Sequence, residues 1–284
     1  LVAAAFPLLA CAQAKVTLSP SVVTATRFPE TSQSLPFGVS VITAEEIERS
    51  GATTVNEALM RVLGVVGRQD LWGGGEYNVD LRGFGATADN NQVVILDGMR
   101  VSEADLSGTR LSGIPIESVE RIEVLRGSGA VLYGEGATGG VIVITTKARA
   151  GKQRPNGGSV YAGVGTDKLR DYRANANVGA GGFALDAFAQ KRDSDGHRDN
   201  FRSKGDAETI TGTWSGEQGL VGLRHSEDKL ATGLPGALTA AEYAANPRQT
   251  TRPDDHADIR NTRTHLFGET QVANWQFALD ADTR

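Results

Sequence analysis

Acidic and imidazole side chains are the first candidates for chemistry in this sequence. Asp193, Asp195 and Asp199 lie close together in one polar segment, and carboxylates are oxygen ligands that Ca²⁺ prefers. Their spacing does not fit the EF-hand loop, so a solvated acidic loop is the alternative interpretation. No nucleophile, base and orienting group stand in a recognisable arrangement, so the sequence predicts neither an enzyme nor a cofactor beyond this Ca²⁺. The histidines are scattered and indicate no transition-metal site, at His197, His225, His256 and His265.

A glycine-rich stretch from Val119 to Lys147 has a superficial likeness to a phosphate-binding loop. Gly127, Gly129 and Gly134 follow an apolar run, as the glycines of such loops follow a strand. A dinucleotide loop has the pattern G-x-G-x-x-G, and a P-loop ends in Gly-Lys-Ser/Thr. Leu132-Tyr133 occupies that place here, so phosphate binding is not predicted.

The same stretch is typical of two packed strands joined by tight turns. Its apolar runs, Val119 to Leu125 and Val141 to Thr145, are rich in β-branched residues, and the segment between them is too short for a normal crossover helix. Glycines gather between the runs, which indicates backbone that turns tightly or lies close against another surface. These glycines are Gly127, Gly129, Gly134, Gly136, Gly139 and Gly140.

Composition limits the class of protein. The chain has 284 residues, a net charge of −5, 39% hydrophobic residues, 35 glycines, 9 prolines and 1 cysteine, which suits one large domain or two ordinary ones. Mild acidity without a basic block argues against nucleic acid as a partner. After residue 14 no apolar stretch reaches about 18 residues, so no membrane-spanning helix is predicted.

Residues 1–14 are predicted to be the remnant of a secretory signal peptide, without its basic start and initiator Met. They are small and apolar and end in Ala12-Gln13-Ala14, the A-x-A form of a signal-peptidase site. Leu8 to Cys11 could instead form a lipoprotein cleavage site that leaves a lipidated cysteine. In either case the mature protein leaves the cytoplasm, and a single cysteine allows no internal disulfide.

Residues 15–38 are predicted to be an extended segment and linker, because Pro20, Pro29 and Pro36 disfavour helix. The segment contains a short β-prone run, made of Val22, Val23, Thr24, Ala25 and Thr26. This run is either an edge strand of the following domain or a free strand that a partner captures by β-augmentation.

Residues 39–148 have the pattern of a small α+β domain, a mixed sheet with short helices. Apolar β-prone runs predict strands at 39–42, 77–81 and 93–96. Two residue pairs have the spacing of helix capping boxes, Thr43 with Glu46 and Thr54 with Glu57. The apolar residues of the second helix fall on one face, which must pack on a sheet; they are Val55, Leu59, Val62 and Leu63.

Residues 158–284 alternate apolar and polar side chains over segments of about ten residues, a pattern typical of strands with one apolar and one polar face. The connections alternate between short turns, as at 179–182 and 216–219, and long polar loops at 193–205 and 228–261. This asymmetry favours an antiparallel transmembrane β-barrel, and a soluble β-sandwich is the alternative.

The number of strands connects the two halves of the chain. A barrel of about eight strands has room only for side chains, whereas a barrel of about 22 strands encloses a plugged lumen. The sequence offers about seven strand candidates, an odd number in a class that favours even ones. We therefore expect the first strands of a wider, incomplete barrel, with the 39–148 domain inside it.

Several motifs, in order along the chain, resemble those of TonB-dependent outer-membrane receptors. The β-prone run at 22–26 is similar to the TonB box of that family. The most specific match lies in the glycine-rich stretch at 119–147. The resemblance covers the plug domain and the first barrel strands, and no barrel motif names a ligand. The matching segments are Leu81-Arg82-Gly83-Phe84, Leu96-Asp97-Gly98, Val119 to Gly127, Leu132-Tyr133-Gly134 and Gly139 to Ile142.

The resemblance implies energised uptake of a scarce nutrient across the bacterial outer membrane. A ligand binds from outside, and the TonB complex, driven by the proton gradient of the inner membrane, pulls the TonB box in the periplasm. The plug then rearranges within the barrel lumen or leaves it. TonB and outer-membrane lipid are the implied partners. A ferric siderophore is the first expected ligand and cobalamin the second, and a structural or adhesive barrel is the alternative without transport.

The resemblance also implies particular site residues. The plug loops at 70–76, 85–91 and 102–109 are expected to face outward, with candidate ligand contacts at Trp72, Tyr77, Phe84, Ser102 and Asp105. Arg82 and Arg126 are predicted to pair with barrel carboxylates and lock the plug, and surface salt bridges of small energetic value are the alternative. Little sequence separates residue 14 from the TonB box, so a signalling extension is not expected.

Overall fold

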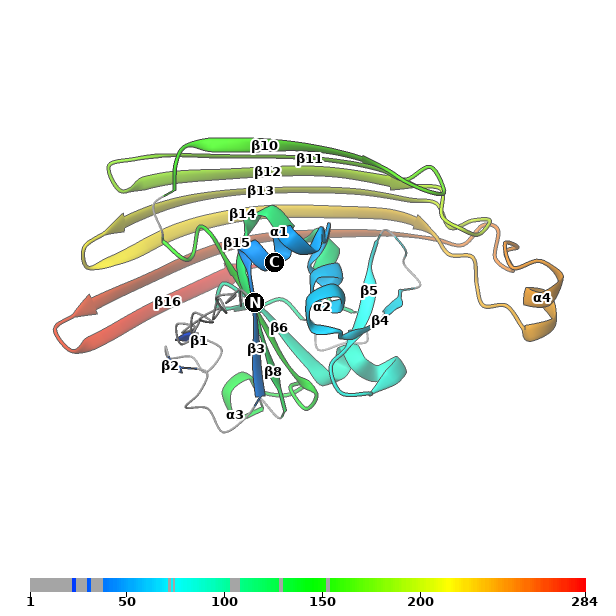
Figure 1. The fold of residues 1–284 in the computed structure, drawn as a ribbon, viewed down its shortest axis with the longest axis horizontal. Helices are drawn as coiled ribbons and strands as arrows, with labels where there is room; N and C mark the ends of the chain where they lie inside the picture. The colour runs from blue at the N-terminus through cyan, green and yellow to red at the C-terminus, as the bar shows by residue number, and fades with distance from the viewer. Residues whose placement is uncertain are drawn as a thin grey trace, which may run out of the picture.

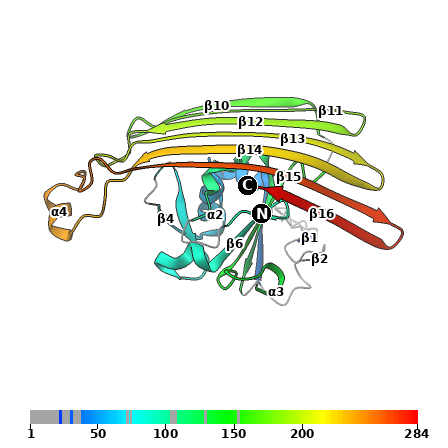
Figure 2. The same ribbon diagram turned by 180° about the vertical axis from the view of Figure 1, so that it is seen from behind.

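The structure is organised by two β-sheets, which form an N-terminal domain and a wall. It is a computed structural model that describes residues 22–23, 30–31, 38–70, 73, 75–102, 108–127, 130–151 and 154–284. We call residues 38–151 the N-terminal domain and residues 157–283 the wall. The wall is a long curved sheet, and the N-terminal domain packs against its concave face in both side views (Figures 1 and 2). The fold class expected from the sequence is therefore confirmed.

The N-terminal domain is built on a mixed five-stranded sheet with the strand order β3-β8-β9-β6-β7. β6 and β9 run parallel, and the other neighbours pair antiparallel. The strands are β3 (Gly38–Thr43), β6 (Gln92–Leu96), β7 (Met99–Arg100), β8 (Val119–Arg126) and β9 (Gly140–Thr146). The two runs of the glycine-rich stretch thus form the antiparallel pair β8–β9 at the centre of the sheet, as the sequence predicts.

Both faces of this sheet are buried, which explains why its central strands are continuous apolar runs. Alternate side chains point to opposite faces, so Ile142 and Ile144 enter one core while Val141 and Val143 enter another. The first core is covered by two helices, which contribute Ile47 and Leu59 among others. The second core is closed by residues of the β8–β9 connection, Tyr133 and Ala137.

The two helices, α1 (Ala44–Ser50) and α2 (Val55–Leu63), begin at the predicted caps. Thr43 and Glu46 form a complete capping box at the start of α1. At α2 the Thr54 hydroxyl accepts from the Glu57 N–H, but the Glu57 carboxylate accepts from the backbone N–H and hydroxyl of Thr53 instead. Both helices end at a left-handed glycine, as helices commonly do.

A small ribbon and several single turns complete the domain. The ribbon pairs β4 (Val66–Gln69) with β5 (Tyr77–Asp80), and Val66 is exposed. The sequence does not predict β4, because Gly67 interrupts any apolar alternation. Gly67 lies against the Met60 side chain of α2, where a Cβ would collide with its sulfur. The turns are η2 (Gly85–Asn91), η3 (Leu111–Gly113), η4 (Ile116–Ser118) and α3 (Ala130–Tyr133).

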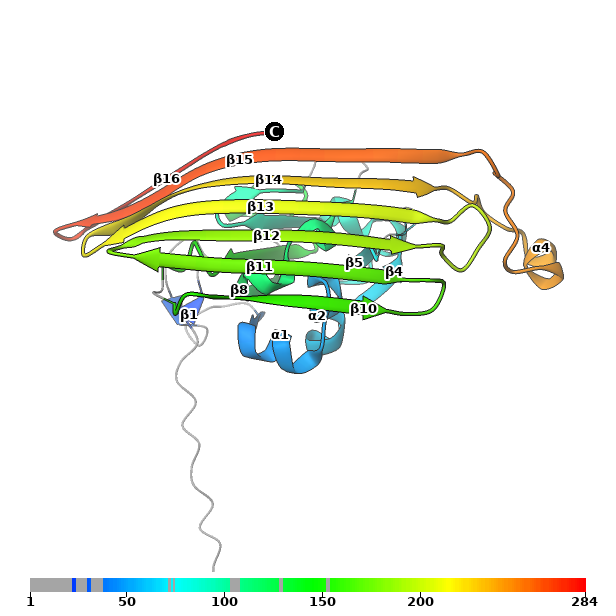
Figure 3. The ribbon, with the colours of Figure 1, turned by 90° about the horizontal axis from the view of Figure 1, so that it is seen from above.

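The wall consists of seven antiparallel strands that lie side by side in sequence order (Figure 3). Adjacent strands are joined by tight turns at one end and by longer connections at the other, where the short helix α4 (Ala240–Ala245) lies. The strands are β10 (Gly157–Val164), β11 (Arg170–Ala180), β12 (Phe183–Ser194), β13 (Ser203–Gly216), β14 (Gly219–Gly233), β15 (His256–Val272) and β16 (Trp275–Thr283).

The two faces of the wall differ in chemistry. On β11, Tyr172 and Val178 are exposed on the outer face, while Asp171 and Arg173 are buried on the inner face. The other strands repeat this order, so the outer surface carries an apolar band, with Phe183, Leu185, Ile210, Trp214, Val221, Leu223, Leu266, Trp275, Phe277 and Leu279. Apolar outside and polar inside is the arrangement of a transmembrane barrel. No helix of the described residues is long and apolar enough to cross a membrane.

The wall strands are longer than the sequence suggests. β15 has 17 residues, or about 58 Å at about 3.4 Å per residue, well beyond a hydrocarbon core of about 30 Å. The predicted loop at 228–261 is therefore wrong at both ends, because 228–233 belong to β14 and 256–261 to β15. Charged residues that look loop-like pair across the strands instead, as Arg260 does with Glu227 at 2.6 Å.

The predicted TonB box is described only in part. Val22–Val23 forms β1, which pairs antiparallel with β2 (Glu30–Thr31). The rest of the box, Thr24 to Thr26, lies outside the described residues. This two-residue pairing offers few backbone hydrogen bonds.

Gly140 is a position where the sheet tolerates no side chain. Its φ is +153°, and a Cβ would lie 2.4 Å from the Leu125 carbonyl oxygen of β8. Gly140→Ala should therefore push β9 from β8 and lower the free energy of unfolding of the domain by about 1–3 kcal/mol. The urea concentration at which the domain becomes protease-sensitive measures this. Gly38→Ala is the control, because nothing lies within 4 Å of its Cβ; equal midpoints for the two variants would contradict the expectation.

Candidate functional site

The contact surface between the N-terminal domain and the inner face of the wall is the most polar buried region of the structure. Five side chains of the domain and the segment that follows it form ion pairs with inward-facing wall residues. The pairs are Asp97–Arg224, Arg110–Asp228, Glu117–Arg173, Arg149 with Glu269 and Asp280, and Arg154–Asp186. We call this set the interface pairs, and they define the candidate functional site.

The most deeply buried interface pair joins Asp97 to Arg224 of β14. Their side chains are 0% and 4% exposed. Asp97 also accepts from the backbone N–H and the hydroxyl of Thr146 at 2.7 and 2.8 Å, where β9 ends. Arg224 Nη2 donates to that hydroxyl at 2.7 Å, and its Nε donates to Thr211 Oγ1 at 3.3 Å. The pair therefore joins the β6–β7 turn, the end of β9 and the middle of the wall.

Local conformation places the Asp97 carboxylate at this point. The Asp97-Gly98 turn between β6 and β7 gives Asp97 a φ of 51° and Gly98 a φ of 93°. Aspartate is among the few non-glycine residues that adopt left-handed backbone readily. The turn follows a fully buried strand, so its carboxylate leaves the sheet directly at the wall. Gly98 lies close to Asp280 of β16, and a Cβ there would lie 3.0 Å from the Asp280 carboxylate.

A second interface pair is supported from inside the domain by Glu76. Arg110 bonds to Asp228, which also accepts from Asn261 Nδ2 at 3.2 Å. The next residues, Leu111 and Ser112, donate their backbone N–H groups to the Glu76 carboxylate at 3.1 and 3.0 Å. Glu76 thus fixes the turn that carries Arg110.

Glu76 is itself buried and has an unusual acidity. It is 4% exposed and accepts from Asn56 Nδ2 at 3.0 Å as well as from the two backbone N–H groups. Burial raises the pKa of Glu76 to about 7, although hydrogen bonds from Ser112 and the charge of Arg110 oppose the rise. Near neutral pH this carboxyl therefore exists in both protonation states.

The third interface pair lies beside the helices. Arg173 of β11 bonds to Glu117 and stacks over the Tyr161 ring, 3.9 Å from its centroid. Burial raises the pKa of Glu117, and the Arg173 guanidinium opposes that rise. Arg173 Nη1 also donates to the Thr53 carbonyl at 3.4 Å, so the start of α2 contacts the wall.

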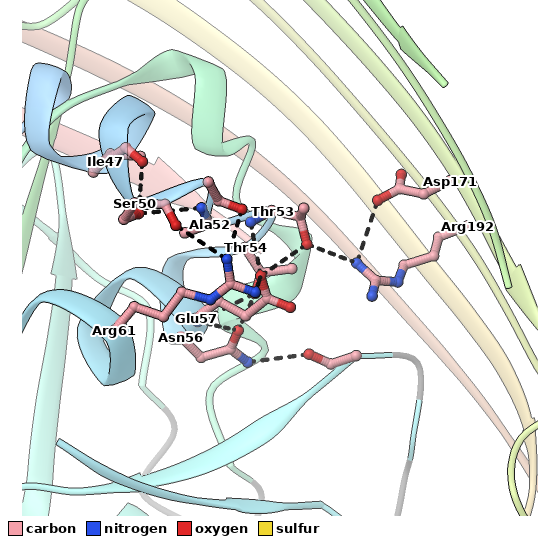
Figure 4. A network of polar contacts seen from close by, with 12 residues as sticks. Ile47, Ser50, Ala52, Thr53, Thr54, Asn56, Glu57, Arg61, Asp171 and Arg192 are labelled. Atoms are coloured by element: carbon pink, nitrogen blue, oxygen red, sulfur yellow. Dashed lines mark hydrogen bonds and ion pairs between the residues drawn. The ribbon is translucent and has the colours of Figure 1, made fainter. Parts of the chain in front are cut away.

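Figure 4 shows how the loop between the helices continues this contact. Arg192 Nη1 lies between Thr53 Oγ1, at 3.5 Å, and Asp171 Oδ2, at 3.4 Å. Within the domain, Arg61 Nη1 donates to the carbonyls of Ser50 and Gly51, which holds the loop in place. The α1–α2 loop is therefore fixed from both sides.

The segment after β9 makes the remaining interface pairs. Arg149 bonds to Glu269 at 2.6 Å and to Asp280 at 3.4 Å, and its guanidinium lies 5.0 Å from the centroid of the buried Phe267 ring. Asp280 also lies 3.1 Å from Nε2 of the buried His265. This segment is thus attached to β15 and β16 before the chain enters β10.

The loop between β4 and β5 contacts the long-loop end of the wall. A Cβ on Gly73 would lie 3.1 Å from the Phe201 ring, which belongs to the β12–β13 connection, and one on Gly75 would lie 2.9 Å from the Arg192 guanidinium. Glu76 follows directly. The residues that contact the wall and the buried Glu76 carboxylate therefore belong to the same loop.

The arginine motif between β5 and η2 has an internal role. Four consecutive backbone N–H groups, from Arg82 to Gly85, donate to the Asp80 carboxylate at 2.7–3.1 Å. Slight burial acts to raise the pKa of Asp80, but these donors outweigh it and the pKa is lowered. The side chain of Arg82 is exposed.

The structure places the two arginines predicted to lock the domain away from the described wall. Arg126 is exposed, and its Nη1 donates to Ser40 Oγ of β3 at 3.1 Å, within the domain. Within the described chain neither Arg82 nor Arg126 reaches a carboxylate of β10 to β16. Their pairing with barrel carboxylates stays a prediction.

Three of the predicted ligand contacts belong to the part of the chain that the structure describes. Tyr77 is half-buried on β5, and Phe84 is 36% exposed beside Gly139. Ser102 is buried, and its hydroxyl accepts from the Val94 N–H at 3.2 Å, so it supports β6. Trp72 and Asp105 lie outside the described residues. Ligand contact by these five residues stays a prediction.

The three aspartates proposed for Ca²⁺ do not assemble into a metal site. Asp195 bonds to Lys168 at 2.7 Å and lies 3.7 Å from Arg202, so two cations already face its carboxylate. The Lys168 hydrogen bond lowers the pKa of Asp195. Among the described residues, no group of three His, Cys, Asp or Glu side chains could hold a metal ion.

Sequence reasoning missed the interface pairs. Asp97 lies in a motif that the sequence analysis noted, but its partner Arg224 lies in a distant strand. One signal was available, since inward positions of the wall can be read from the alternation, and a charge there needs a partner. Glu76 gave no such signal, because only the fold brings it to Leu111 and Ser112.

Comparison with protein families and curated proteins gives a consistent match. The family model described as TonB-dependent Receptor Plug Domain matches residues 31–141. The chain is 37% identical over 160 residues to the vitamin B12 transporter BtuB of Vibrio cholerae serotype O1, across 56% of this chain and 25% of that protein. The chain thus spans about a quarter of the length of the curated relatives it matches.

Solved structures share the fold. The unliganded ferric citrate transporter FecA gives a TM-score of 0.72 at 22% identity, over 88% of this chain and 40% of that one. The ferripyoverdine receptor of Pseudomonas aeruginosa, bound to ferripyoverdine, gives 0.71 at 18% identity, over 93% and 36%. The yersiniabactin uptake receptor FyuA of Yersinia pestis gives 0.66 at 19% identity, over 87% and 40%. At these identities the likeness concerns the fold alone.

Breaking the central interface pair from one side should loosen the domain strongly. Arg224→Met leaves the Asp97 carboxylate buried without its charged partner, which should cost about 3–5 kcal/mol of docking stability. The double variant Asp97→Asn/Arg224→Met should lose less than the sum of the single variants. Urea titration of protease sensitivity in the full-length receptor measures both. Arg49→Ala, at an exposed arginine of α1, is the control and should change stability by less than about 0.5 kcal/mol. Strict additivity would contradict direct coupling.

The raised pKa of Glu76 predicts a pH effect of definite sign. The folded state holds this proton up to about pH 7, while an unfolded glutamate loses it near about 4.3. Between these values the folded state binds more protons, so local stability falls as pH rises, by about 3 kcal/mol in total. Hydrogen exchange of the Leu111 and Ser112 amides, corrected for intrinsic rates, measures it. Glu76→Gln should remove the pH dependence, and a variant that keeps it would assign the effect elsewhere.

Proposed function

The chain belongs to the TonB-dependent outer-membrane receptors, and on that premise we propose that it serves the energised uptake of a scarce solute into the periplasm. In this family the N-terminal domain is the plug and the wall is part of the outer-membrane barrel around it. The family is one of transport receptors rather than enzymes. The short-turn end of the wall faces the periplasm, and the long connections face outward.

The observation that carries this proposal is the buried pair between Asp97 and Arg224. A domain that only closed a pore passively would need no such fixed charges. Separating the pair in place would leave the fully buried Asp97 carboxylate without its charged partner, at a cost of several kcal/mol. Spontaneous opening is therefore rare, and opening on demand requires external work. Work supplied from the periplasm through TonB meets that need.

The attachment point for that work is β1. Among the described residues, Val22–Val23 pairs with the two residues of β2, and a partner strand would add to its other edge. Backbone pairing with TonB by β-augmentation would give a handle on the N-terminal domain. Outer-membrane lipid is the second partner, since the apolar band on the outer face of the wall suits a hydrocarbon environment.

A cobalamin is the first substrate candidate, because relatives at 37% identity are named vitamin B12 transporters. A ferric siderophore, the first ligand expected from the sequence resemblance, is the second candidate. The solved ferric citrate and ferripyoverdine receptors support it only through their shared fold, at 22% and 18% identity.

The proposal is tested by separating binding from uptake. Val23→Pro removes a backbone N–H from β1 and should abolish energised uptake while leaving surface binding unchanged. Binding and uptake of radiolabelled cyanocobalamin and of a ferric siderophore are measured in cells that express the full-length receptor. Thr17→Pro, upstream of the box, is the control and should transport normally. Uptake that survives Val23→Pro, or that persists after the proton gradient is collapsed, would refute energised uptake through this segment.

A further inference from the structure

Two cavities lie between the N-terminal domain and the wall, and they share a boundary. The first, of about 120 Å³, extends from Arg110 and Asp228 down to Asp186 of β12. The second, of about 130 Å³, continues to the tight β11–β12 turn at Gly181 and Gly182. Since that turn belongs to the short-turn end of the wall, the two cavities together lead from the middle of the interface towards the periplasm.

The residues common to both cavities mark a neck. They are Lys147, Ala148, Arg154 and Asn177. Across this neck Arg154 Nη2 donates to Asp186 Oδ1 at 2.6 Å, from the segment after β9 to the inner face of the wall. The Arg154–Asp186 ion pair therefore lies where the two cavities meet.

Unpaired polar atoms line the first cavity and show that it is made for polar contents. Among the described residues, Arg110 Nε, Arg154 Nε and Arg224 Nη1 are buried donors without a hydrogen-bond partner. Glu117 Oε2 and Asp186 Oδ2 are buried acceptors in the same condition. Donors and acceptors on one cavity wall suit water or a neutral hydrogen-bonding solute better than an ion of one sign. Each volume far exceeds the about 10–15 Å³ that one water needs.

The Arg154–Asp186 pair has the properties of a gate rather than of a fixed lock. Its side chains are 24% and 23% exposed, whereas those of Asp97 and Arg224 are 0% and 4% exposed. Each partner keeps one unpaired polar atom that water can satisfy when the pair opens. Opening at the neck therefore costs less than breaking the central pair, because neither charge is left dry.

We propose that the joined cavities are the periplasmic half of the solute path and that the Arg154–Asp186 pair is its gate. Solute would leave along the inner faces of β11 to β13, past the segment that follows β9. This route does not require the Asp97–Arg224 pair on β14 to separate. The path takes hydrogen-bonding solutes of low net charge. This inference rests on the proposed uptake function, but its test needs no transported substrate.

The test measures access to the first cavity with a small thiol reagent. Thr209→Cys, a half-buried inward residue that lines this cavity, is introduced into an otherwise cysteine-free full-length receptor. The probe is 2-(trimethylammonium)ethyl methanethiosulfonate. With the pair intact, labelling should be slow, and adding Arg154→Gln should raise the rate at least about tenfold. Asp186→Asn breaks the same pair from the wall side and should do the same.

A blocking variant assigns the route. Asn177→Trp fills the neck and, added to Arg154→Gln, should return the labelling rate to its slow value. Ala174→Trp lies on the outer face of the same strand and should leave the rate fast. Leu223→Cys on the lipid face should not react with this charged reagent. Folding of every variant is verified by heat-modifiable gel mobility.

The outcomes are decisive for the gate. Equal labelling of Thr209→Cys with and without Arg154→Gln and Asp186→Asn would overturn it, and fast labelling despite Asn177→Trp would overturn the route. Because no nutrient is used, these results stand apart from the uptake assay. A receptor that shows the gate but transports neither probe would refute only the proposed function.

Discussion

The structure depends on one constraint, that charges removed from water between two sheets must be paired. Asp97 and Arg224 meet it together, and Thr146 and Thr211 add hydrogen bonds to the pair. The pair fixes three things at once: the left-handed turn after β6, the end of β9, and the depth at which the domain sits along β14. A buried pair of this kind contributes more to a unique arrangement than to net stability, since desolvation offsets most of the attraction. Its main effect is therefore to specify position.

The second constraint comes from the medium around the wall. An apolar outer face requires that the alternate side chains of every strand point inward, and in this wall they are largely polar. The domain thus contacts threonines, aspartates and arginines rather than an apolar surface. Its own apolar side chains pack in two internal cores, on either side of the five-stranded sheet. The domain is consequently complete in itself and attached by hydrogen bonds and ion pairs, which can be broken without opening a core.

These constraints explain what the sequence could predict. Periodicity located β8 and β9, the helix caps at Thr43 and Thr54, and the alternating wall, because each depends on neighbours in the chain. The interface pairs depend on which strand faces which loop, and no local pattern carries that information. Arg82 and Arg126 were predicted from motifs. In the structure the backbone N–H of Arg82 donates to the Asp80 carboxylate, and the Arg126 side chain donates to Ser40. The predicted ends of β14 and β15 were wrong for a related reason. Charged residues such as Glu227 and Arg260 are typical of loops in the sequence, but they pair across the two strands.

The polarity of the interface also determines how the N-terminal domain can be displaced from the wall. A dry apolar interface of this extent would resist displacement over its whole area, since every increment of exposed apolar surface costs about 25 cal/mol per Å². An interface made of ion pairs beside polar cavities resists displacement mainly at those ion pairs. The Asp97–Arg224 pair resists separation because its side chains are only 0% and 4% exposed, whereas those of Arg154 and Asp186 are 24% and 23% exposed and can exchange their partner for water. Resistance is then greatest at the central pair and lowest at the most exposed one. A force applied at the N-terminal end of the chain has to break the central pair and the largely buried pairs Arg110–Asp228 and Glu117–Arg173, whereas Arg154 and Asp186 can hydrate as they separate.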